Sequence, residues 1–275
     1  LGDGVFKDSQ AIEYFSVAHN DEFTTIGAEA FMNSSLREVD LFDSVTTIGA
    51  RAFAGCAQLE ELTLPDSLTT IGEGALDGLT GLKKLVIKCD PALIPAGVFA
   101  NMPNLSEVTI ESGAVPAHMF AGSGVKALTL GEGVTEIGES AFADTLLSAA
   151  DLKHVTAIGA GAFANTAMTS VELPQAAAIG EGAFEGSALE SVRLSAAASV
   201  GERAFANTKL KQLVIPTAGS FPLSAVEGTS VELRLPADAT DAQLAAWNET
   251  LECPWYDPML REGEVSKFVK MPFEP

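Results

Sequence analysis

The sequence predicts an α/β repeat solenoid, in which each coil supplies one strand of a parallel β-sheet and one short helical turn. Two observations predict this fold class. An apolar anchor, in most copies a Phe, recurs every 21 to 23 residues, and the pattern L-x-x-L-x-L lies between successive anchors. A single coil cannot bury its apolar face alone, so stacked coils must bury the faces of their neighbours.

The anchors follow an Ile-Gly-like pair through most of the chain. They are Phe31, Phe53, Leu76, Phe99, Phe120, Phe142, Phe163, Phe184 and Phe205, with Phe6 before them and a weaker copy, Val226, after them. This spacing is the length of a leucine-rich repeat. We therefore expect a right-handed curved leucine-rich-repeat array of about ten to eleven repeats over residues 1–235.

Between the anchors, apolar and polar residues alternate, which predicts short strands with one buried face. Clear copies are Leu36-Val39-Leu41, Leu59-Leu62-Leu64, Leu82-Leu85-Ile87, Leu105-Val108-Ile110, Leu189-Val192-Leu194 and Leu210-Leu213-Ile215. Ile12-Phe15-Val17 begins the series and a weaker Leu233-Leu235 closes it. Eleven strands are expected if every copy forms.

Two columns of residues follow the anchors. The first tolerates turn geometry and should end each helical turn; it holds Asn33, Gly55, Gly78, Asn101, Gly122, Asp144, Asn165, Gly186 and Asn207. The second holds small hydrogen-bonding side chains that should pair with backbone groups: Ser34, Cys56, Ser123, Thr145, Thr166, Ser187 and Thr208. Because Cys56 belongs to this column, we interpret it as structural.

The Ile-Gly pair before each anchor should start the helical turn, with Gly permitting the bend. Two copies read Ile94-Pro95 and Val115-Pro116. Pro fits the first turn of a helix, where its missing N–H has no cost, so we expect the turn to start there as well.

The repeat pattern stops after Leu235, and residues 236–275 are predicted to form a C-terminal cap. Thr240 or Asp238 can cap one amphipathic helix that carries Leu244 and Trp247. Pro254 and Pro258 are expected to end this cap helix.

Composition excludes several classes of function. The formal net charge of −21 disfavours nucleic acid and anionic membranes as partners, and such a surface serves solubility or, alternatively, a cationic partner. No apolar run is long enough to cross a bilayer. Cys56, Cys89 and Cys253 are too few and too scattered for a disulfide framework or a zinc site. The chain begins at Leu1 without an apolar leader, which we interpret as a processed or excised segment.

The repeat unit resembles a known family. The pattern I-G-x-x-A-F-x-x-[small]-x-x-L-x-x-V/L-x-L, as in Ile179 to Leu194, is similar to the BspA-like class of bacterial leucine-rich repeats and recurs over about residues 1–235. The resemblance implies a curved solenoid, usually on secreted or surface-attached proteins. Such proteins are often called adhesins that bind host extracellular proteins or other bacteria.

No catalytic, cofactor-binding or metal-binding residue is predicted. His19, His118 and His154 lie in different coils and columns, too far apart to share a site. The acids Glu132, Glu136, Glu139 and Asp144 lack a calcium-loop pattern and fit a solvated face. The Gly-rich copies such as "GEGAF" recur in every coil without the Lys-Ser/Thr ending of a phosphate loop.

What remains for function is the outward row of side chains on the strands. The candidate partner-binding residues are Asp40, Thr63, Lys84, Thr109, Asp151, Glu172, Arg193 and Arg234. Arg193 and Arg234 are the strongest of these, because binding hot spots favour Arg, Trp and Tyr.

These observations favour a non-enzymatic protein-binding module of a secreted or cell-surface bacterial protein, with adhesion to a host extracellular or bacterial surface protein as its role. The alternative is a structural spacer that displays other domains. An enzyme within residues 236–275 is disfavoured, because that segment has no His and only Cys253 as a nucleophile.

Overall fold

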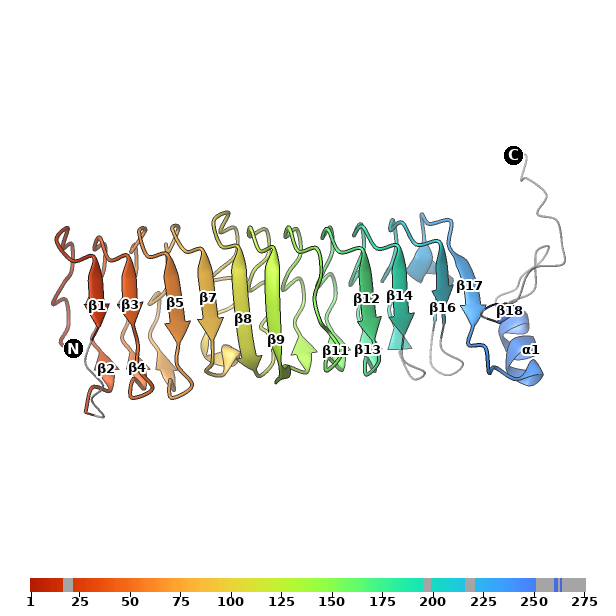
Figure 1. Cartoon of the computed structure of the whole chain (residues 1–275), viewed down its shortest axis with the longest axis horizontal. Helices are drawn as coiled ribbons and strands as arrows, with labels where there is room; N and C mark the ends of the chain where they lie inside the picture. The colour runs from red at the N-terminus through yellow and green to blue at the C-terminus, as the bar shows by residue number, and fades with distance from the viewer. Residues whose placement is uncertain (17–21, 195–198, 216–220, 251–259, 262, 264–275) are drawn as a thin grey trace.

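The structure is a computed structural model that describes residues 1–275 apart from 17–21, 195–198, 216–220, 251–259, 262 and 264–275. The chain winds into an elongated solenoid whose larger strands stand side by side in a nearly straight row (Figure 1). Consecutive coils pair in parallel, as between β5 and β7. The predicted parallel-strand solenoid is confirmed. The α/β class is not, because the described residues contain one α-helix among many strands.

The larger strands form the face that is turned toward the reader in Figure 1, here called the front face. They lie in two sheets, β1-β3-β5-β7-β8-β9 and β12-β14-β16-β17-β18. Their bounds are β1 (Tyr14–Ser16), β3 (Glu38–Asp40), β5 (Glu61–Leu64), β7 (Lys84–Ile87), β8 (Glu107–Ser112), β9 (Ala127–Gly133), β12 (Ser170–Leu173), β14 (Ser191–Leu194), β16 (Gln212–Val214), β17 (Glu232–Leu235) and β18 (Leu260–Arg261). Ten of the eleven strands expected from the repeats form, and β18 pairs with β17 beyond the last repeat.

The eleventh expected strand does not form, and its absence divides the front face into these two sheets. Residues 148–152 are described and carry no strand. Ala150 takes the place that Val108 and Val171 occupy in neighbouring coils, and it is half-buried where both valines are buried. Ala has a lower strand propensity than Val and buries less apolar surface, which accounts for the gap.

A second set of short strands, here called the back ladder, carries the Ile of each Ile-Gly pair. It consists of β2 (Thr25–Ile26), β4 (Thr47–Ile48) and β6 (Thr70–Ile71), then β10 (Glu136–Ile137), β11 (Ala157–Ile158), β13 (Ala178–Ile179) and β15 (Ser199–Val200). The two groups form separate sheets. Between them, Val115 makes one isolated bridge with Ile137.

The glycine of the Ile-Gly pair allows neighbouring coils to approach closely, which is a different role from the bend that the sequence suggested. A Cβ on Gly49 would lie 2.6 Å from Ala28 N. The Gly49 N–H also donates to Ile26 O at 2.8 Å. Pro95 and Pro116 carry a ring in that position and have no N–H to donate. The expectation that proline has no cost there is wrong, and the back ladder is interrupted at both.

The turns that carry the anchors from Phe6 to Phe205 are not helical, so the predicted helical turns are a second correction; the last anchor, Val226, lies in a short 3-10 helix. Around Phe31, Glu29 and Asn33 have φ values of 55° and 56°. Two left-handed residues in one turn prevent the continuous i to i−4 bonding of an α-helix. The Phe31 N–H donates instead to Ala52 O of the next coil at 2.8 Å.

The prediction for the first column after the anchors is confirmed, since every member has a positive φ. Helical segments among the described residues are η1 (Pro91–Leu93), η2 (Leu223–Val226) and α1 (Asp241–Thr250).

The anchors form a stack along the core. From Phe99 to Phe205, successive ring centroids lie 5.2 to 5.9 Å apart with ring planes within 12° of parallel. Each of these rings is fully buried. Leu76 interrupts the stack between Phe53 and Phe99.

Most of the second column after the anchors pairs with the backbone as predicted, but Ser34 Oγ contacts Cys56 Sγ at 3.5 Å, and Ser187 Oγ is buried without a partner among the described residues. Ser123 Oγ donates to Phe120 O at 2.6 Å, and Thr145 Oγ1 donates to Phe142 O at 2.8 Å. These bonds satisfy polar groups that are buried against the Phe stack.

Helix α1 follows the array, as the sequence predicts. Thr240 is its N-cap: the Thr240 N–H donates to Gln243 Oε1 at 2.8 Å, and the Gln243 N–H donates to Thr240 Oγ1 at 3.3 Å. Pro254, Pro258 and the side chain of Trp247 lie outside the described residues.

Candidate functional site

The front face carries a hollow of about 680 Å³ over β12, β14 and β16. Its outward lining is polar and comes from four successive coils. The lining residues are Ser170, Val171, Glu172, Glu190, Ser191, Val192, Arg193, Leu194, Lys211, Gln212, Val214 and Pro236. A hollow that combines small polar side chains with longer charged ones is suited to a polar partner surface.

The hollow forms where small side chains meet a loosened sheet. Ser170 and Ser191 are in register on β12 and β14, and their short side chains leave space above the strands. Between β14 and β16 the register is reduced to one pair, Arg193 with Val214. Fewer ladder bonds hold these two strands together than hold β12 to β14, so the surface opens at this point.

Four charged side chains line this hollow. Glu172 lies directly beside Arg193 on the neighbouring strand, and both are exposed. Glu190 and Lys211 precede β14 and β16 and are exposed as well. Within the described part of the chain, none of the four makes an ion pair within 4.0 Å. Their charges are therefore free to meet a partner.

The other predicted residues lie along the front face and are not gathered into the hollow. Asp40 is exposed on β3, and Thr63 and Thr109 are half-exposed on β5 and β8. Lys84 is 4.0 Å from Glu61. Asp151 accepts a bond from Lys153 at 2.8 Å, and this hydrogen bond lowers the pKa of the Asp151 carboxyl. These predicted residues are thus separate side chains in two adjacent rows, with Lys84 in register with Glu61 and Glu107 rather than with Thr63 and Thr109.

Arg234 is a correction to the predicted surface. It is 5% exposed and contacts Glu232 at 2.6 Å through Nη2. Its Nε and Nη1 atoms are buried and have no hydrogen-bond partner among the described residues. In register it faces Leu260 of β18. A further strand pairs with β17 at this end of the sheet, and the alternation of residues along β17 did not predict that the Arg234 side chain is buried.

The sequence analysis missed Glu190, Lys211 and Pro236 as lining residues. Glu190 and Lys211 stand one position before each strand begins, where the chain still faces the front. Extending the aligned rows by one position would have found both. Pro236 could not be found in this way, because it follows the last strand of the repeats.

The two described thiols are free and buried. Cys56 Sγ donates to Phe31 O at 3.0 Å, and burial raises the pKa of its thiol. Burial raises the pKa of Cys89 to about 11. The described residues contain no group of three or more His, Cys, Asp or Glu side chains that could hold a metal ion. Cys253 and His19 lie outside the described residues.

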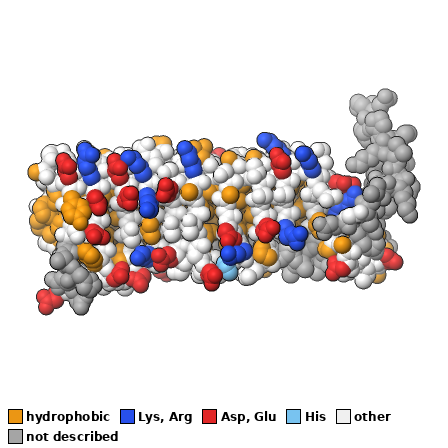
Figure 2. All heavy atoms as spheres, viewed as in Figure 1, with side chains coloured by type: hydrophobic (Ala, Val, Ile, Leu, Met, Phe, Trp, Pro, Cys, Tyr) orange, Lys and Arg blue, Asp and Glu red, His pale blue; other side chains and the backbone are white. Residues whose placement is uncertain are grey.

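Charges on the front face are mixed, and apolar side chains gather mainly at its N-terminal end (Figure 2).

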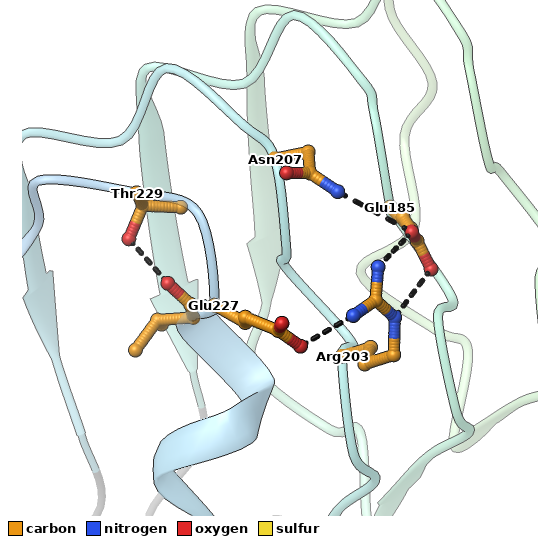
Figure 3. Close-up of polar contacts among 6 residues, drawn as sticks. Glu185, Arg203, Asn207, Glu227 and Thr229 are labelled. Carbon is orange, nitrogen blue, oxygen red and sulfur yellow. Dashed lines mark hydrogen bonds and ion pairs between the residues drawn. The ribbon is translucent and has the colours of Figure 1, made fainter.

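On the anchor turns, by contrast with the front face, ion pairs link neighbouring coils. Arg203 joins Glu185 of the preceding coil and Glu227 of the following coil (Figure 3), with Arg203 Nη2 2.5 Å from Glu185 Oε1. The bond from Arg203 lowers the pKa of Glu185. These charges are satisfied internally, which distinguishes them from the four at the hollow.

Comparison with protein families gives one match. The sequence profile described as "BspA type Leucine rich repeat region" matches residues 1–115 and 113–229, in six copies. Comparison with curated proteins gives no match.

Three solved structures are similar to this chain. A leucine-rich repeat protein from Bacteroides ovatus is 18% identical, covers 85% of this chain and 78% of its own, and has a TM-score of 0.46. A leucine-rich cell surface protein from Faecalibacterium prausnitzii is 18% identical, with 86% and 90% covered and a TM-score of 0.32. A leucine-rich repeat protein from Eubacterium ventriosum is 17% identical, with 83% and 91% covered and a TM-score of 0.33.

No helix in the described ranges is both long and apolar enough to span a membrane.

Proposed function

This chain belongs to the family of BspA-type leucine-rich repeat proteins, and from that premise we propose that it is a non-enzymatic protein-binding module of a bacterial surface or secreted protein. Its partner is a host extracellular or bacterial surface protein, held by the front face. Both described thiols are buried: that of Cys56 is hydrogen-bonded, and that of Cys89 has a raised pKa. Such thiols are poor nucleophiles, which suits a scaffold better than a catalyst.

The observation that carries the proposal is the hollow at β12, β14 and β16. Glu172, Glu190, Arg193 and Lys211 are exposed there and make no ion pair within the described part of the chain. Strands hold such side chains more rigidly than loops do, so less conformational entropy is lost when a partner binds. The mixed signs favour a partner patch that also carries both charges.

The rest of the front row extends this surface toward the N-terminus. Thr63 and Thr109 lie in one row with Val86 between them, and Lys84 lies in the adjacent row between Glu61 and Glu107. Together with Asp40 and Asp151, these side chains would contact the flank of a large partner. Contacts at such a rim affect the rate of association more than the final affinity.

A charge-reversal experiment tests the proposal. The chain and the variant Arg193→Glu/Lys211→Glu are passed over immobilised matrix, plasma and bacterial surface proteins, and binding is measured by surface plasmon resonance. We expect a micromolar or tighter partner whose affinity falls about tenfold or more in the variant. Lys88→Glu/Lys209→Glu is the matched control, since it changes the net charge equally and neither residue lines the hollow. Equal losses in both variants would contradict a site at the hollow.

A structural spacer is the second candidate, favoured by the stacked Phe core and the elongated shape (Figure 1). A spacer needs a stiff body and no partner of its own. It is supported if the same screen finds no micromolar binder while the chain remains folded.

A further inference from the structure

Neighbouring anchor turns are joined by backbone hydrogen bonds that repeat along the solenoid. Between the turns of Phe163 and Phe184, three bonds of 2.7 to 2.8 Å run from Gly161 N, Phe163 N and Asn165 N to the carbonyls of Glu181, Ala183 and Glu185. The same three positions are bonded at most other junctions, including that between the turns of Phe31 and Phe53. These bonds are here called the turn ladder.

The turn ladder is missing at one place. All residues from 70 to 122 are described, yet no such bond joins the turn of Leu76 to the turn of Phe99. Between the turns of Phe99 and Phe120, one bond remains, from Asn101 N to Ala121 O at 2.8 Å. Two successive junctions have therefore lost most of the bonding on this side.

The back ladder is interrupted at the same two junctions. In intact coils the glycine N–H bonds to the preceding Ile, as from Gly72 N to Ile48 O at 2.7 Å. Pro95 and Pro116 replace that glycine and cannot donate. The two junctions within residues 70–122 thus lack the back-ladder bonds and all but one of the turn-ladder bonds.

The two prolines also explain why the turns separate. A Cβ on Gly72 would lie 2.3 Å from Ala50 N, so intact coils have no room for a side chain there. A pyrrolidine ring at 95 or 116 must move the coil outward to avoid this contact. Val98 adds bulk, because it stands where Ala52 and Ala162 stand in intact coils.

Packing is looser at these coils. The aromatic stack is interrupted at Leu76, and no ring contact joins Phe53 to Phe99. Ile71 and Val98 are half-buried, whereas the equivalent Ile48 and Ala52 are fully buried.

The front face holds the same two junctions firmly. Four residue pairs join β5 to β7, and four join β7 to β8. Lys83 adds an ion pair to Glu60 at 2.8 Å. The coils are therefore fastened along one side and open on the other.

We infer that residues 70–122 form a hinge, at which the solenoid opens on its turn side while the front strands β5, β7 and β8 stay paired. Opening changes the angle between the front face of β1–β5 and that of β9–β17. Of the turn-ladder and back-ladder bonds that would oppose it at these two junctions, one remains, from Asn101 N to Ala121 O. The inference is independent of what the front face binds.

Native-state hydrogen exchange on the full chain, resolved by residue with NMR, tests the hinge. The amides of Ala75 and Asp77 bond within their own turn, as those of Ala162 and Ala164 do, at 3.0 to 3.3 Å. We expect the first pair to exchange at least about tenfold faster than the second, and the amides of β7 to exchange slowly. Equal rates for the two pairs, or β7 exchanging as fast as Ala75, would overturn the hinge.

The variant Pro95→Gly/Pro116→Gly tests the cause. Restoring the glycine and its N–H should slow exchange at Ala75 and Asp77 by about tenfold, toward the rates of Ala162 and Ala164. Unchanged rates at Ala75 would refute the assignment of the hinge to these prolines. Exchange at Ala162 is the internal reference and should not move.

Discussion

Two regions of the solenoid hold their coils together from opposite sides. In residues 70–122 the front strands are continuous, with four pairs each from β5 to β7 and from β7 to β8, while the back ladder is interrupted. In residues 136–200 the back ladder is continuous through β10, β11, β13 and β15, while the front sheet is divided at residues 148–152. Each interruption lies where the opposite side is intact.

Single residues determine whether the back ladder or the front sheet is interrupted in each region. Pro95 and Pro116 remove a donor and occupy space that glycine leaves free, and Ala150 takes the place of a valine in the front sheet. Because stability in a solenoid is roughly a sum over neighbouring coils, one interrupted ladder is tolerated where another remains. The difference shows that stacking in this chain is redundant, and that redundancy is lowest at the hinge.

The largest expected effect comes from breaking the core of the second region. Phe163 is fully buried, and its ring centroid lies 5.5 Å from Phe142 and 5.4 Å from Phe184. Phe163→Ala removes both ring contacts and leaves a cavity, so we expect a loss of about 3 to 5 kcal/mol in the free energy of unfolding. Urea titration measures it. Leu223→Ala, at a 51% exposed side chain, is the control and should change stability by less than about 0.5 kcal/mol.

Two left-handed glycines, one before its anchor and one after it, compare the two regions next. Gly186 has φ +68°, and a Cβ there would lie 2.3 Å from Asn165 Oδ1, whose amide nitrogen is held by Asp144. Gly97 has φ +73°, and a Cβ there would lie 3.9 Å from His118 O, an ordinary van der Waals distance. Gly97→Ala should cost about 1 to 2 kcal/mol for the left-handed backbone alone, and Gly186→Ala about 1 kcal/mol more, because the Asn165 bond must break.

The same urea titration separates the cost of the left-handed backbone from the cost of the contact with Asn165. In an Asn165→Gly background, where that bond is already absent, Gly186→Ala should cost only about 1 to 2 kcal/mol, as Gly97→Ala does, because the two sites are coupled. Equal losses for the two alanine variants would show that the tight contact with Asn165 is not a constraint.

Repairing the front sheet is expected to stabilise the second region slightly. Ala150→Val restores the residue type found at Val108 and Val171, and should raise the free energy of unfolding by up to about 1 kcal/mol. Ala149→Val, at the exposed neighbouring position, is the control, with less than about 0.5 kcal/mol expected. A loss of stability on Ala150→Val would mean that the gap is required by packing.

The smallest effect concerns the ion pairs of the turns. Arg203 lowers the pKa of Glu185 through a hydrogen bond. A depressed carboxyl pKa stabilises the fold above the unfolded value of about 4.3, and this contribution is lost as the pH falls through the folded value. Arg203→Gln should therefore lower Tm slightly at pH 7, by an amount that shrinks toward pH 3 and in high salt. A pH-independent difference in Tm, measured against Lys209→Gln, would contradict this assignment.

The anchors and their two columns could be predicted because buried side chains repeat with the coil, and a repeat leaves its period in the sequence. Phe163, Asn165 and Thr166 illustrate all three positions. The turn conformation could not be predicted, since left-handed residues at Glu29 and Arg51 give no compositional signal.

The sequence also did not predict how individual residues contribute to the stacking of coils. The close approach at Gly49 depends on the distance between coils, and an alignment of the repeats shows that glycine recurs without showing why. For the candidate site, Glu172 and Arg193 were predicted from alternation, whereas Arg234 is buried at the end of the array, where the chain continues beyond the repeat into β18.

Distances between spin labels test the central claim most directly. Ala50 and Glu139 occupy equivalent exposed turn positions four coils apart across residues 70–122, and Glu139 and Leu223 are four coils apart across the second region. With Cys253 replaced by Ser, each pair is converted to Cys, labelled and measured by pulsed electron double resonance at separations of about 19 Å. The account predicts a clearly broader distance distribution for Ala50 and Glu139 than for Glu139 and Leu223. Distributions of equal width would contradict a solenoid with one hinge.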